Sequence, residues 1–328
     1  MPGWTTYDIP TQAGRTAIVT GAGGLGYETA LALARTGARV IIGGRNSRKG
    51  ADAVAKIRAE VPRSDVRFGE IDLADLASVA AFAKDIAAEH ASIDLLVNNA
   101  GVMTPPTRQL TRDGFELQFG TNHLGHFALT SRLLALLRSG RGARVVNVSS
   151  GAHHTGRIAF GDLQSERRYG PWRAYGQSKL AMLMFAFELQ RRSDAQGWGL
   201  IANAAHPGYA RTELIANGRG ETGLLWQINR WLIRPRLSQS AADGALPTLF
   251  AATSPQAQGG AYYGPSGFFE LIGPPLPARI SKRARDIGVA ARLWQESERL
   301  AGVRFGEPMS AIGGSAFRPD ALQALDRG

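Results

Sequence analysis

Cysteine is absent from all 328 residues of the sequence. Its absence excludes thiolate catalysis, zinc–cysteine sites and a disulfide framework, and it favours a reducing compartment. Long hydrophobic runs are also lacking: no apolar stretch reaches the ~18 residues typical of a membrane span, and the first twenty residues carry no signal-peptide pattern. We therefore expect a soluble, cytoplasmic protein without a stable membrane span.

Acidic residues are fewer than basic ones, 27 against 38, which gives a formal net charge of +11. Such a charge attracts nucleic acids, anionic membrane surfaces or phosphorylated cofactors. The arginines are scattered, however, and the one dense basic cluster, Arg279–Arg285, has no interleaved aromatic residues. We therefore expect no nucleic-acid partner, whereas a phosphorylated cofactor fits and peripheral membrane contact stays open.

Hydrophobic residues make up 44% of the chain, enough for a large core. Short β-rich runs alternate with longer segments whose apolar residues recur every three or four positions. The expected strands are 16–20, 39–42, 65–68, 94–97, 144–148, 199–203 and 262–263; the expected helices are 27–36, 50–60, 76–89, 114–138, 175–192 and 240–252. This alternation predicts an α/β fold, a doubly wound parallel sheet with helices on both faces.

A glycine-rich loop directly follows the first expected strand and opens the first helix. In that context the G-x-G-x-x-G pattern predicts a Rossmann-like dinucleotide site. The loop allows a tight turn, close backbone approach to a pyrophosphate, and a helix N-terminus that faces the phosphates. The expected cofactor contacts are Gly21, Gly23, Gly24, Leu25 and Gly26.

The end of the second expected strand bears on the choice of cofactor. An acidic residue at this place accepts hydrogen bonds from the adenine ribose of NAD(H), but the chain has Gly43-Gly44-Arg45-Asn46 there. A guanidinium favours a 2′-phosphate, so Arg45 and Asn46 predict NADP(H), with NAD(H) as the alternative. Asp72, with Leu73 beside it, is a candidate contact for the adenine amino group.

Tyr175 and Lys179 stand four residues apart, which places both on one face of a helix. Free tyrosine has a pKa near 10, and a neighbouring ammonium or a cationic nicotinamide favours the phenolate. Tyr175 could then exchange a proton with a substrate alcohol or carbonyl oxygen. Taken alone, this spacing is also typical of a packed tyrosine beside a solvated lysine.

Five motifs in fixed order make the chain resemble the short-chain dehydrogenase/reductases over about residues 14–215: Thr20–Gly26, Asn98–Gly101, Asn147–Ser150, Tyr175-x-x-x-Lys179 and His206–Gly208. A long insertion between Ser150 and Tyr175 and the segment Asn122–Phe127 resemble the retinol dehydrogenase and WW-domain-containing oxidoreductase branch. The protochlorophyllide reductases are similar as well. The resemblance implies an oxidoreductase of the alcohol dehydrogenase class.

The resemblance also implies roles for individual residues. Ser150 would hydrogen-bond the substrate oxygen, and Tyr175 would be the general acid/base. Lys179 would bind the nicotinamide ribose and lower the pKa of Tyr175, and Asn122 would hold a proton-relay water. The remaining implied contacts are with the cofactor: Asn98, Ala100 and Gly101 on the adenosine ribose side, Val148 near the nicotinamide, and Pro207, Gly208 and Thr212 around its far face and carboxamide.

A single domain is expected to span residues 14–305, after an N-terminal extension at 1–13 and before a C-terminal tail at 306–328. The amphipathic segment 224–233 stands where the family folds a lid over its substrate, so we place a lid at about 209–240. Core packing, membrane contact and dimerisation are the alternatives for this segment. The family also implies a homo-oligomer, a dimer or a tetramer.

We expect reversible hydride transfer between NADP(H) and a lipophilic alcohol, aldehyde or ketone. Two alternatives stay open: reduction of an activated C=C bond, and nucleotide sensing without turnover. The glycine loop is one residue shorter than the family's T-G-x-x-x-G-x-G, and we expect none of the N-terminal anchor typical of animal retinol enzymes. No metal site is expected, because the histidine pairs His123/His126 and His153/His154 have no carboxylate at ligand spacing.

Overall fold

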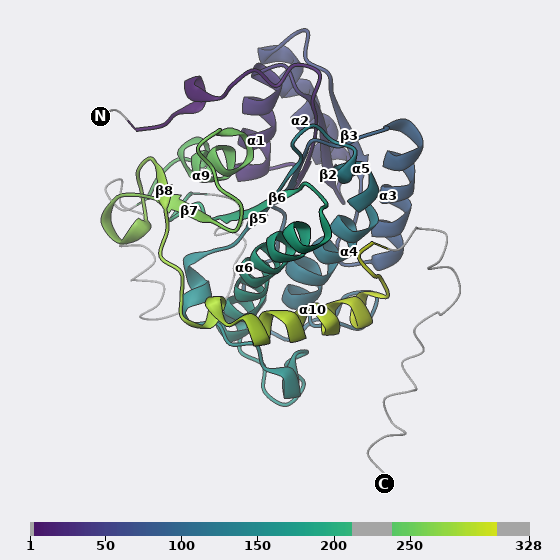
Figure 1. Ribbon diagram of the computed structural model, residues 1–328, viewed down its shortest axis with the longest axis vertical. Coiled ribbons are helices and arrows are strands. Elements are labelled where there is room, and N and C mark those ends of the chain that lie inside the picture. The colour runs from purple at the N-terminus through teal and green to yellow at the C-terminus, as the bar shows by residue number, and fades with distance from the viewer. Residues whose placement is uncertain (1–2, 212–237, 307–328) are drawn as a thin grey trace.

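A mixed eight-stranded sheet forms the centre of the protein. The computed structural model describes residues 3–211 and 238–306. The strands are ordered β3-β2-β1-β4-β5-β6-β7-β8; those from β1 to β7 run parallel, and β8 is antiparallel to β7 (Figure 1). Their bounds are β1 Thr16–Thr20, β2 Arg39–Gly44, β3 Val66–Glu70, β4 Leu95–Asn98, β5 Arg144–Val148, β6 Ile201–Ala205, β7 Tyr262–Pro265 and β8 Pro275–Pro277.

Helices cover both faces of this sheet, as expected for strands that are apolar on both sides. One core joins the sheet to α1, α2 and α9, and another joins it to α3, α4, α6 and α10. The bounds are α1 Gly24–Arg35, α2 Ser47–Glu60, α3 Leu76–Glu89, α4 Gly125–Arg132, α5 Leu134–Arg138, α6 Pro171–Gln196, α9 Ala241–Thr253 and α10 Ile287–Ala301. The predicted doubly wound α/β fold is therefore confirmed.

Several elements differ from the sequence-based expectation. The expected helix 114–138 is divided into a π-helical turn, Phe119–Leu124, followed by α4 and α5. Helix α10 and the edge strand β8 were not predicted. The expected helix 224–233, most of the lid at 209–240 and residues 307–328 of the tail lie outside the described residues.

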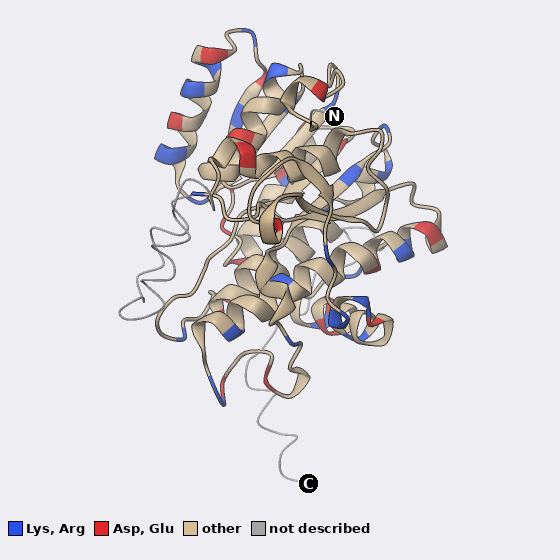
Figure 2. Cartoon of the chain, turned by 90° about the vertical axis from the view of Figure 1, so that its left-hand side faces the viewer, with Lys and Arg blue, Asp and Glu red and all other residues tan. Residues whose placement is uncertain are grey.

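The surface carries basic and acidic residues together. Figure 2 shows Lys and Arg interspersed with Asp and Glu over the helices, and none of the described helices is long and apolar enough to cross a membrane.

The segment before β1 packs on α9 through an edge-to-face contact between Trp4 and Phe250, with ring centroids 5.4 Å apart.

The order of the strands reverses between β1 and β4, so the connections that leave these two strands go to opposite faces of the sheet. In such sheets a crevice opens at the carboxyl ends of the strands at this point. Asn98 ties the end of β4 to β5, because its amide Nδ2 donates to Asn147 Oδ1 over 2.9 Å. The loops after β1, β2, β4 and β5 therefore meet at one edge.

Candidate active site and cofactor cleft

The glycine loop turns sharply from β1 into α1. Gly21 has φ +99° and Gly24 has φ +50°, both in the left-handed region that favours glycine. A Cβ on Gly26 would lie 2.0 Å from the carbonyl oxygen of Gly21, so this position admits no side chain. The N-cap residue Gly23 supplies no capping side chain to α1. The first turn of α1 can therefore receive a phosphate at its N-H groups.

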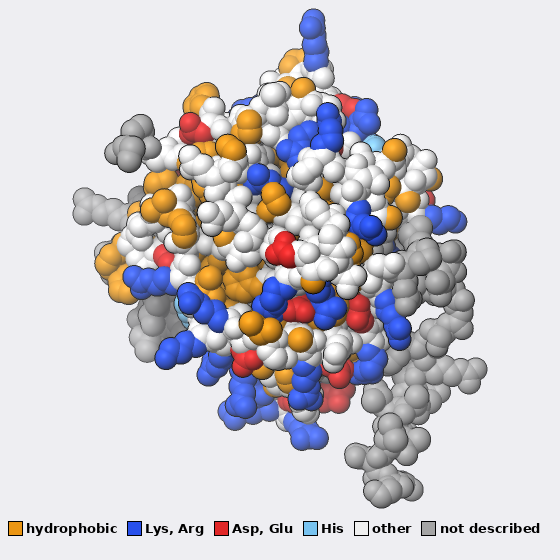
Figure 3. Space-filling model, in the orientation of Figure 1, with side chains coloured by type: hydrophobic (Ala, Val, Ile, Leu, Met, Phe, Trp, Pro, Cys, Tyr) orange, Lys and Arg blue, Asp and Glu red, His pale blue; other side chains and the backbone are white. Residues whose placement is uncertain are grey.

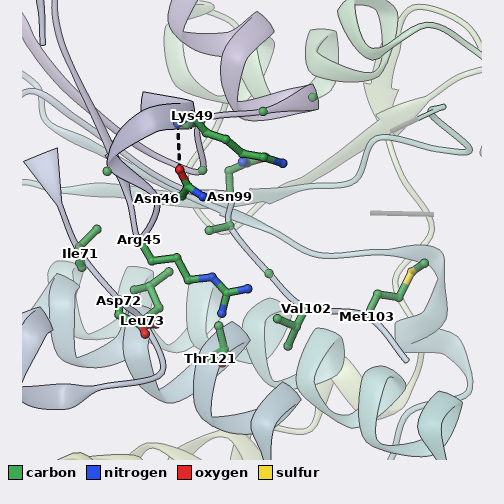
Figure 4. A pocket seen from close by; sticks show the side chains of 18 of the residues that line it. Arg45, Asn46, Lys49, Ile71, Asp72, Leu73, Asn99, Val102, Met103 and Thr121 are labelled. Carbon is green, nitrogen blue, oxygen red and sulfur yellow. Dashed lines mark hydrogen bonds between the residues drawn. The ribbon is translucent and has the colours of Figure 1, made fainter. Parts of the chain in front are cut away.

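A cavity of about 550 Å³ opens beside this loop (Figure 4). It is lined by the loop itself, the end of β2, the turn after β3 and the segment after β4. The sequence-predicted residues on its wall are Gly21, Gly23, Gly24, Leu25, Arg45, Asn46, Asp72, Leu73, Ala100 and Gly101. The structure thus brings together the residues proposed for the adenosine and pyrophosphate part of a dinucleotide.

The end of the cavity at β2 is positively charged. Arg45 extends from β2 into the cavity, and Lys49 reaches it from the first turn of α2 (Figure 4). Asn46 caps α2 by accepting a hydrogen bond from Lys49 N over 2.9 Å. The partial positive charge of the α2 N-terminus adds to the two cationic side chains. This end of the cavity suits an anionic group such as a phosphate.

The predicted acid/base pair lies on α6, which starts at Pro171 after a chain segment in extended conformation. The hydroxyl of Ser150, which follows β5, lies near that of Tyr175 and favours its phenolate. One helical turn further on, Lys179 Nζ lies 5.8 Å from the centre of the Tyr175 ring and donates to the carbonyl oxygen of Val148 over 3.0 Å. Tyr175 and Lys179 are 6% and 4% exposed.

Burial dominates the titration of this pair. It raises the pKa of Tyr175 to about 12, although the neighbouring Ser150 hydroxyl acts in the opposite direction. Burial also lowers the pKa of Lys179 to about 8. The expected lowering of the tyrosine pKa by the lysine is therefore not seen in the chain alone. Tyr175 holds its proton at neutral pH, the form that can donate to a carbonyl oxygen.

Asn122 connects the cavity to α6. Its Oδ1 accepts from Val102 N over 2.8 Å, while its Nδ2 donates to Val102 O and to Ser178 Oγ, each over 3.0 Å. It lies in the π-helical turn that interrupts the helix after 118, an irregularity common at functional sites. A Cβ on Gly101 would come within 3.7 Å of Lys179 Nζ, so the cavity wall reaches the predicted catalytic pair.

The turn after β6 carries Pro207 and Gly208. Gly208 has φ +60°, its N-H donates to His206 Nδ1 over 3.3 Å, and Gln239 Nε2 donates to the Pro207 carbonyl over 2.8 Å. On the other side of the imidazole, His206 Nε2 lies 3.3 Å from Glu270 Oε2. The turn is held in one conformation from two sides. Thr212, predicted to bind the carboxamide, lies outside the described residues.

The carboxylate of Glu270, which lies beside His206 Nε2 and Arg279, predicts a pH-dependent stability. Burial alone would raise the pKa of Glu270, but hydrogen bonds from His206 and Arg279 N lower it below the ordinary 4.5. A lowered pKa gives stability that is present above the unfolded-state value and is lost as the pH falls through the folded-state value. Glu270→Gln should therefore lower the free energy of unfolding by about 0.5–1 kcal/mol at pH 7.

Urea unfolding of the wild type and Glu270→Gln at neutral and acidic pH measures this contribution. The difference between the two proteins should shrink as the pH falls below about 4.5. Glu166→Gln is the matched control, because Glu166 is exposed and pairs only loosely with Arg108, at 3.6 Å. A difference that persists unchanged at acidic pH would show that Glu270 acts by packing rather than by charge.

Some predicted residues lie beside the cavity rather than on its wall. Asn98 is fully buried and donates to Thr130 and Asn147, whereas its neighbour Asn99 lines the cavity. Gly26 packs beneath the glycine loop. The cavity wall does not include Pro207, Gly208, Asn122, Ser150, Tyr175 and Lys179.

Other wall residues were not expected from the sequence: Asn99, Val102, Met103, Pro105, Pro106, Gln109, Leu117 and Thr121. Their place directly after the Asn-Asn-Ala-Gly motif was the available signal for most of them. Apolar side chains predominate in this group, so this part of the cavity can accept a lipophilic molecule.

The histidine pairs have structural roles. His126 Nδ1 donates to Asn122 O over 2.8 Å, and its Nε2 lies 2.9 Å from Thr20 Oγ1. His123 Nε2 lies 2.8 Å from Ser297 Oγ. Burial lowers the pKa of His126 to about 4 and that of His123 to about 3, so both are neutral at pH 7. Within the described ranges, no three His, Asp or Glu side chains gather as metal ligands would.

Known proteins match this chain over most of its length. The family model for short chain dehydrogenases matches residues 15–222. The polyprenol dehydrogenase of Mus musculus is 41% identical over 306 residues, covering 91% of this chain and 87% of the relative. The retinol dehydrogenase 12 of Homo sapiens is 41% identical over 297 residues, covering 89% of this chain and 88% of the relative.

Solved structures share the fold. An uncharacterised protein from Mycobacterium paratuberculosis superposes with a TM-score of 0.77 at 43% identity, covering 93% of this chain and 100% of that one. The RhlG/NADP active-site complex of Pseudomonas aeruginosa superposes with a TM-score of 0.61 at 26% identity, covering 77% of this chain and 94% of that one.

Proposed function

Because the chain belongs to the short-chain dehydrogenase family and is an oxidoreductase, we propose that it transfers a hydride between NADP(H) and a lipophilic alcohol or carbonyl compound. The observation that carries the proposal is the placement of Tyr175 next to Ser150, with Lys179 one helical turn away, beside a cleft that suits a dinucleotide. Two relatives named for lipophilic alcohols and the apolar wall around Met103 support the substrate class.

The cleft fits a phosphorylated dinucleotide by its own geometry. The glycine loop leaves no room for side chains at Gly26, and the first turn of α1 is not capped by one. Arg45 supplies the cation that a 2′-phosphate requires, and guanidinium binds phosphate through paired hydrogen bonds. Gly21, Gly24, Asp72 and Ala100 would hold the rest of the nucleotide, and its nicotinamide would supply or accept the hydride.

The chain's own residues would then handle the proton and the substrate oxygen. Ser150 would donate a hydrogen bond to that oxygen, and Tyr175 would give its phenolic proton to it in carbonyl reduction. In alcohol oxidation Tyr175 would take the proton back. Lys179 would bind the ribose and, with its charge, favour the phenolate. Pro207 and Gly208, in their fixed turn, would support the nicotinamide.

Purified protein mixed with NADPH and a series of long-chain aldehydes and ketones tests the proposal. Nicotinamide oxidation, followed by absorbance, should depend on the carbonyl compound and should be faster for long apolar chains than for short ones. Tight NADPH binding with no turnover of any carbonyl compound would overturn the proposed reaction.

Arg45→Asp should reverse the preference between the two nicotinamide cofactors. Loss of a charge-assisted hydrogen bond to phosphate costs about 1.5–3 kcal/mol, so NADPH affinity should fall by about 10–100-fold. NADH affinity should be kept or improved, because a carboxylate can accept from the ribose hydroxyls. Fluorescence titration with each cofactor measures the change.

The matched control for Arg45→Asp is Arg48→Gln. Arg48 stands three residues further on, in α2, and does not line the cavity. This variant should leave both affinities within about two-fold, as expected for an exposed charge that solvent and salt screen. Equal losses in the two variants would show a general effect of positive charge rather than recognition by Arg45.

A further inference from the structure

The β7–β8 hairpin exposes aromatic side chains at its tip. Phe268 and Phe269 are 63% and 72% exposed, and their rings meet edge to face with centroids 4.4 Å apart. Leu276, on β8, is 55% exposed. Grouped exposed apolar residues of this size mark an interaction surface more often than isolated ones do.

The backbone at this tip is strained. Phe269 has φ +50° and Glu270 has φ +59°, a region that costs about 1 kcal/mol or more for residues with a side chain. The conformation is held by hydrogen bonds across the hairpin, from Ser266 N to Pro274 O and from Gly267 N to Ile272 O. The hairpin thus holds a fixed conformation in which both phenyl rings are exposed.

Basic residues lie directly after the hairpin. The segment that leads from β8 to α10 carries four exposed cationic side chains, those of Arg279, Lys282, Arg283 and Arg285. Ile287, which follows them, is 59% exposed. Figure 3 shows hydrophobic side chains at the left-hand edge, over the hairpin, and Lys and Arg side chains below them. Of the two nearby carboxylates, Glu270 contacts His206 and Arg279, and Asp286 caps α10.

Both parts of this surface are fixed to the catalytic end of the cleft. Tyr209 N, just after the Pro207–Gly208 turn, donates to Leu271 O over 2.8 Å. Ser281 N donates to His153 Nε2 over 3.4 Å, and His153 Nδ1 in turn contacts Ser150 O at 2.8 Å. The hairpin and the segment 279–285 are therefore hydrogen-bonded to the parts of the chain that carry Pro207–Gly208 and Ser150.

We propose that Phe268, Phe269 and Leu276, together with the cationic segment 279–285, form a docking surface for anionic lipid bilayers. Aromatic rings bury favourably at the level of the lipid headgroups, and Lys and Arg side chains pair with lipid phosphates. The charge is complementary to such a membrane and unfavourable for contact with a second copy of the same basic surface. Resting on the proposed function, the inference gives a lipophilic substrate a direct path from the bilayer to the cleft.

Co-sedimentation of the full-length protein with vesicles tests this surface. Binding should be clear with vesicles that contain phosphatidylglycerol and weak with phosphatidylcholine alone, and salt should reduce it. The double variant Phe268→Ser/Phe269→Ser should lower the partition coefficient at least about ten-fold, the loss expected from two rings that no longer bury apolar area. Arg279→Gln/Lys282→Gln should lower it for anionic vesicles only.

Two control variants distinguish binding through this surface from non-specific hydrophobic or electrostatic binding to vesicles. Tyr7→Ser removes an aromatic side chain that is 97% exposed elsewhere, and Arg48→Gln removes a cation of α2. Both should bind vesicles as the wild type does. Vesicle binding that is absent in the wild type, or equal in the double variant, would overturn the proposal. So would gel filtration that shows a wild-type dimer abolished by Phe268→Ser/Phe269→Ser.

The outcome is separable from that of the proposed function. A short, water-soluble aldehyde should be reduced equally by the wild type and the double variant, because the surface lies outside the groups that contact the substrate oxygen. Vesicle binding without turnover of any carbonyl compound would refute the reaction and leave the docking surface supported. Turnover without vesicle binding would refute the docking surface alone.

Discussion

Tyr175→Phe is expected to reduce kcat by about 10²–10⁴-fold, the usual contribution of a positioned acid/base group. The variant loses one oxygen, and with it the proton donor that lies beside Ser150. Phenylalanine fills the same buried space, so the fold and the NADP(H) affinity should be preserved. Steady-state reduction of a long-chain aldehyde, with cofactor binding measured by fluorescence, gives both quantities.

Tyr263→Phe is the matched control for that experiment. Tyr263 is a buried tyrosine whose hydroxyl accepts from Gln258 N over 2.8 Å, away from the cleft. Its loss should lower stability by about 1 kcal/mol and leave kcat unchanged. Turnover of Tyr175→Phe within a few-fold of the wild type would assign the proton to another group.

Lys179→Met is expected to abolish turnover and to make the protein more stable at the same time. Burial lowers the pKa of Lys179 from 10.5 to about 8, so the folded state disfavours the ammonium. That shift corresponds to a cost of about 3 kcal/mol at neutral pH. The variant also loses the hydrogen bond to Val148 O, which lowers the free energy of unfolding by about 1–1.5 kcal/mol. The net gain is about 1–2 kcal/mol in the free energy of unfolding at pH 7.

The pH dependence of unfolding identifies the cause of this gain. Between the folded pKa of about 8 and the unfolded value of 10.5, the unfolded chain binds more protons, so the stability of the wild type rises with pH. In Lys179→Met this rise should disappear, and the advantage of the variant should shrink by pH 10. The exposed Lys84→Met, on α3, should show no effect at either pH. A destabilised Lys179→Met at pH 7 would contradict the buried-charge argument.

Local patterns in the sequence predicted most of the sheet and its helices. The expected strand 144–148 and helix 76–89 coincide with β5 and α3, because their apolar periodicity and flanking residues are both clear. Helix α10, which was not predicted, is bounded by two residues typical of helix ends, the N-cap Asp286 and the C-cap Gly302. Strand β8, with prolines at both ends, has no periodicity and depends on pairing with β7.

The site was predicted best where a motif carries its own geometry. The glycine loop, Arg45, Asp72 and the residues after β4 meet at one cavity because each follows a parallel strand. Asn99 lines the cavity in place of the predicted Asn98. Asn98 is instead held by its side-chain hydrogen bond to Asn147, which sequence spacing does not reveal. The raised pKa of Tyr175 depends on burial by distant segments, which is likewise not local information.

The short antiparallel strand β8 has a consequence for how copies of this chain meet at high concentration. A free strand edge is a template for pairing with another molecule, which leads to aggregation. Here the edge consists of three residues, two of them Pro275 and Pro277, which lack the N-H group that such pairing requires. At the opposite edge, β3 places Arg67 and Glu70 along the strand. Edge-to-edge pairing, the first step of fibril growth, is thus discouraged at both ends of the described sheet.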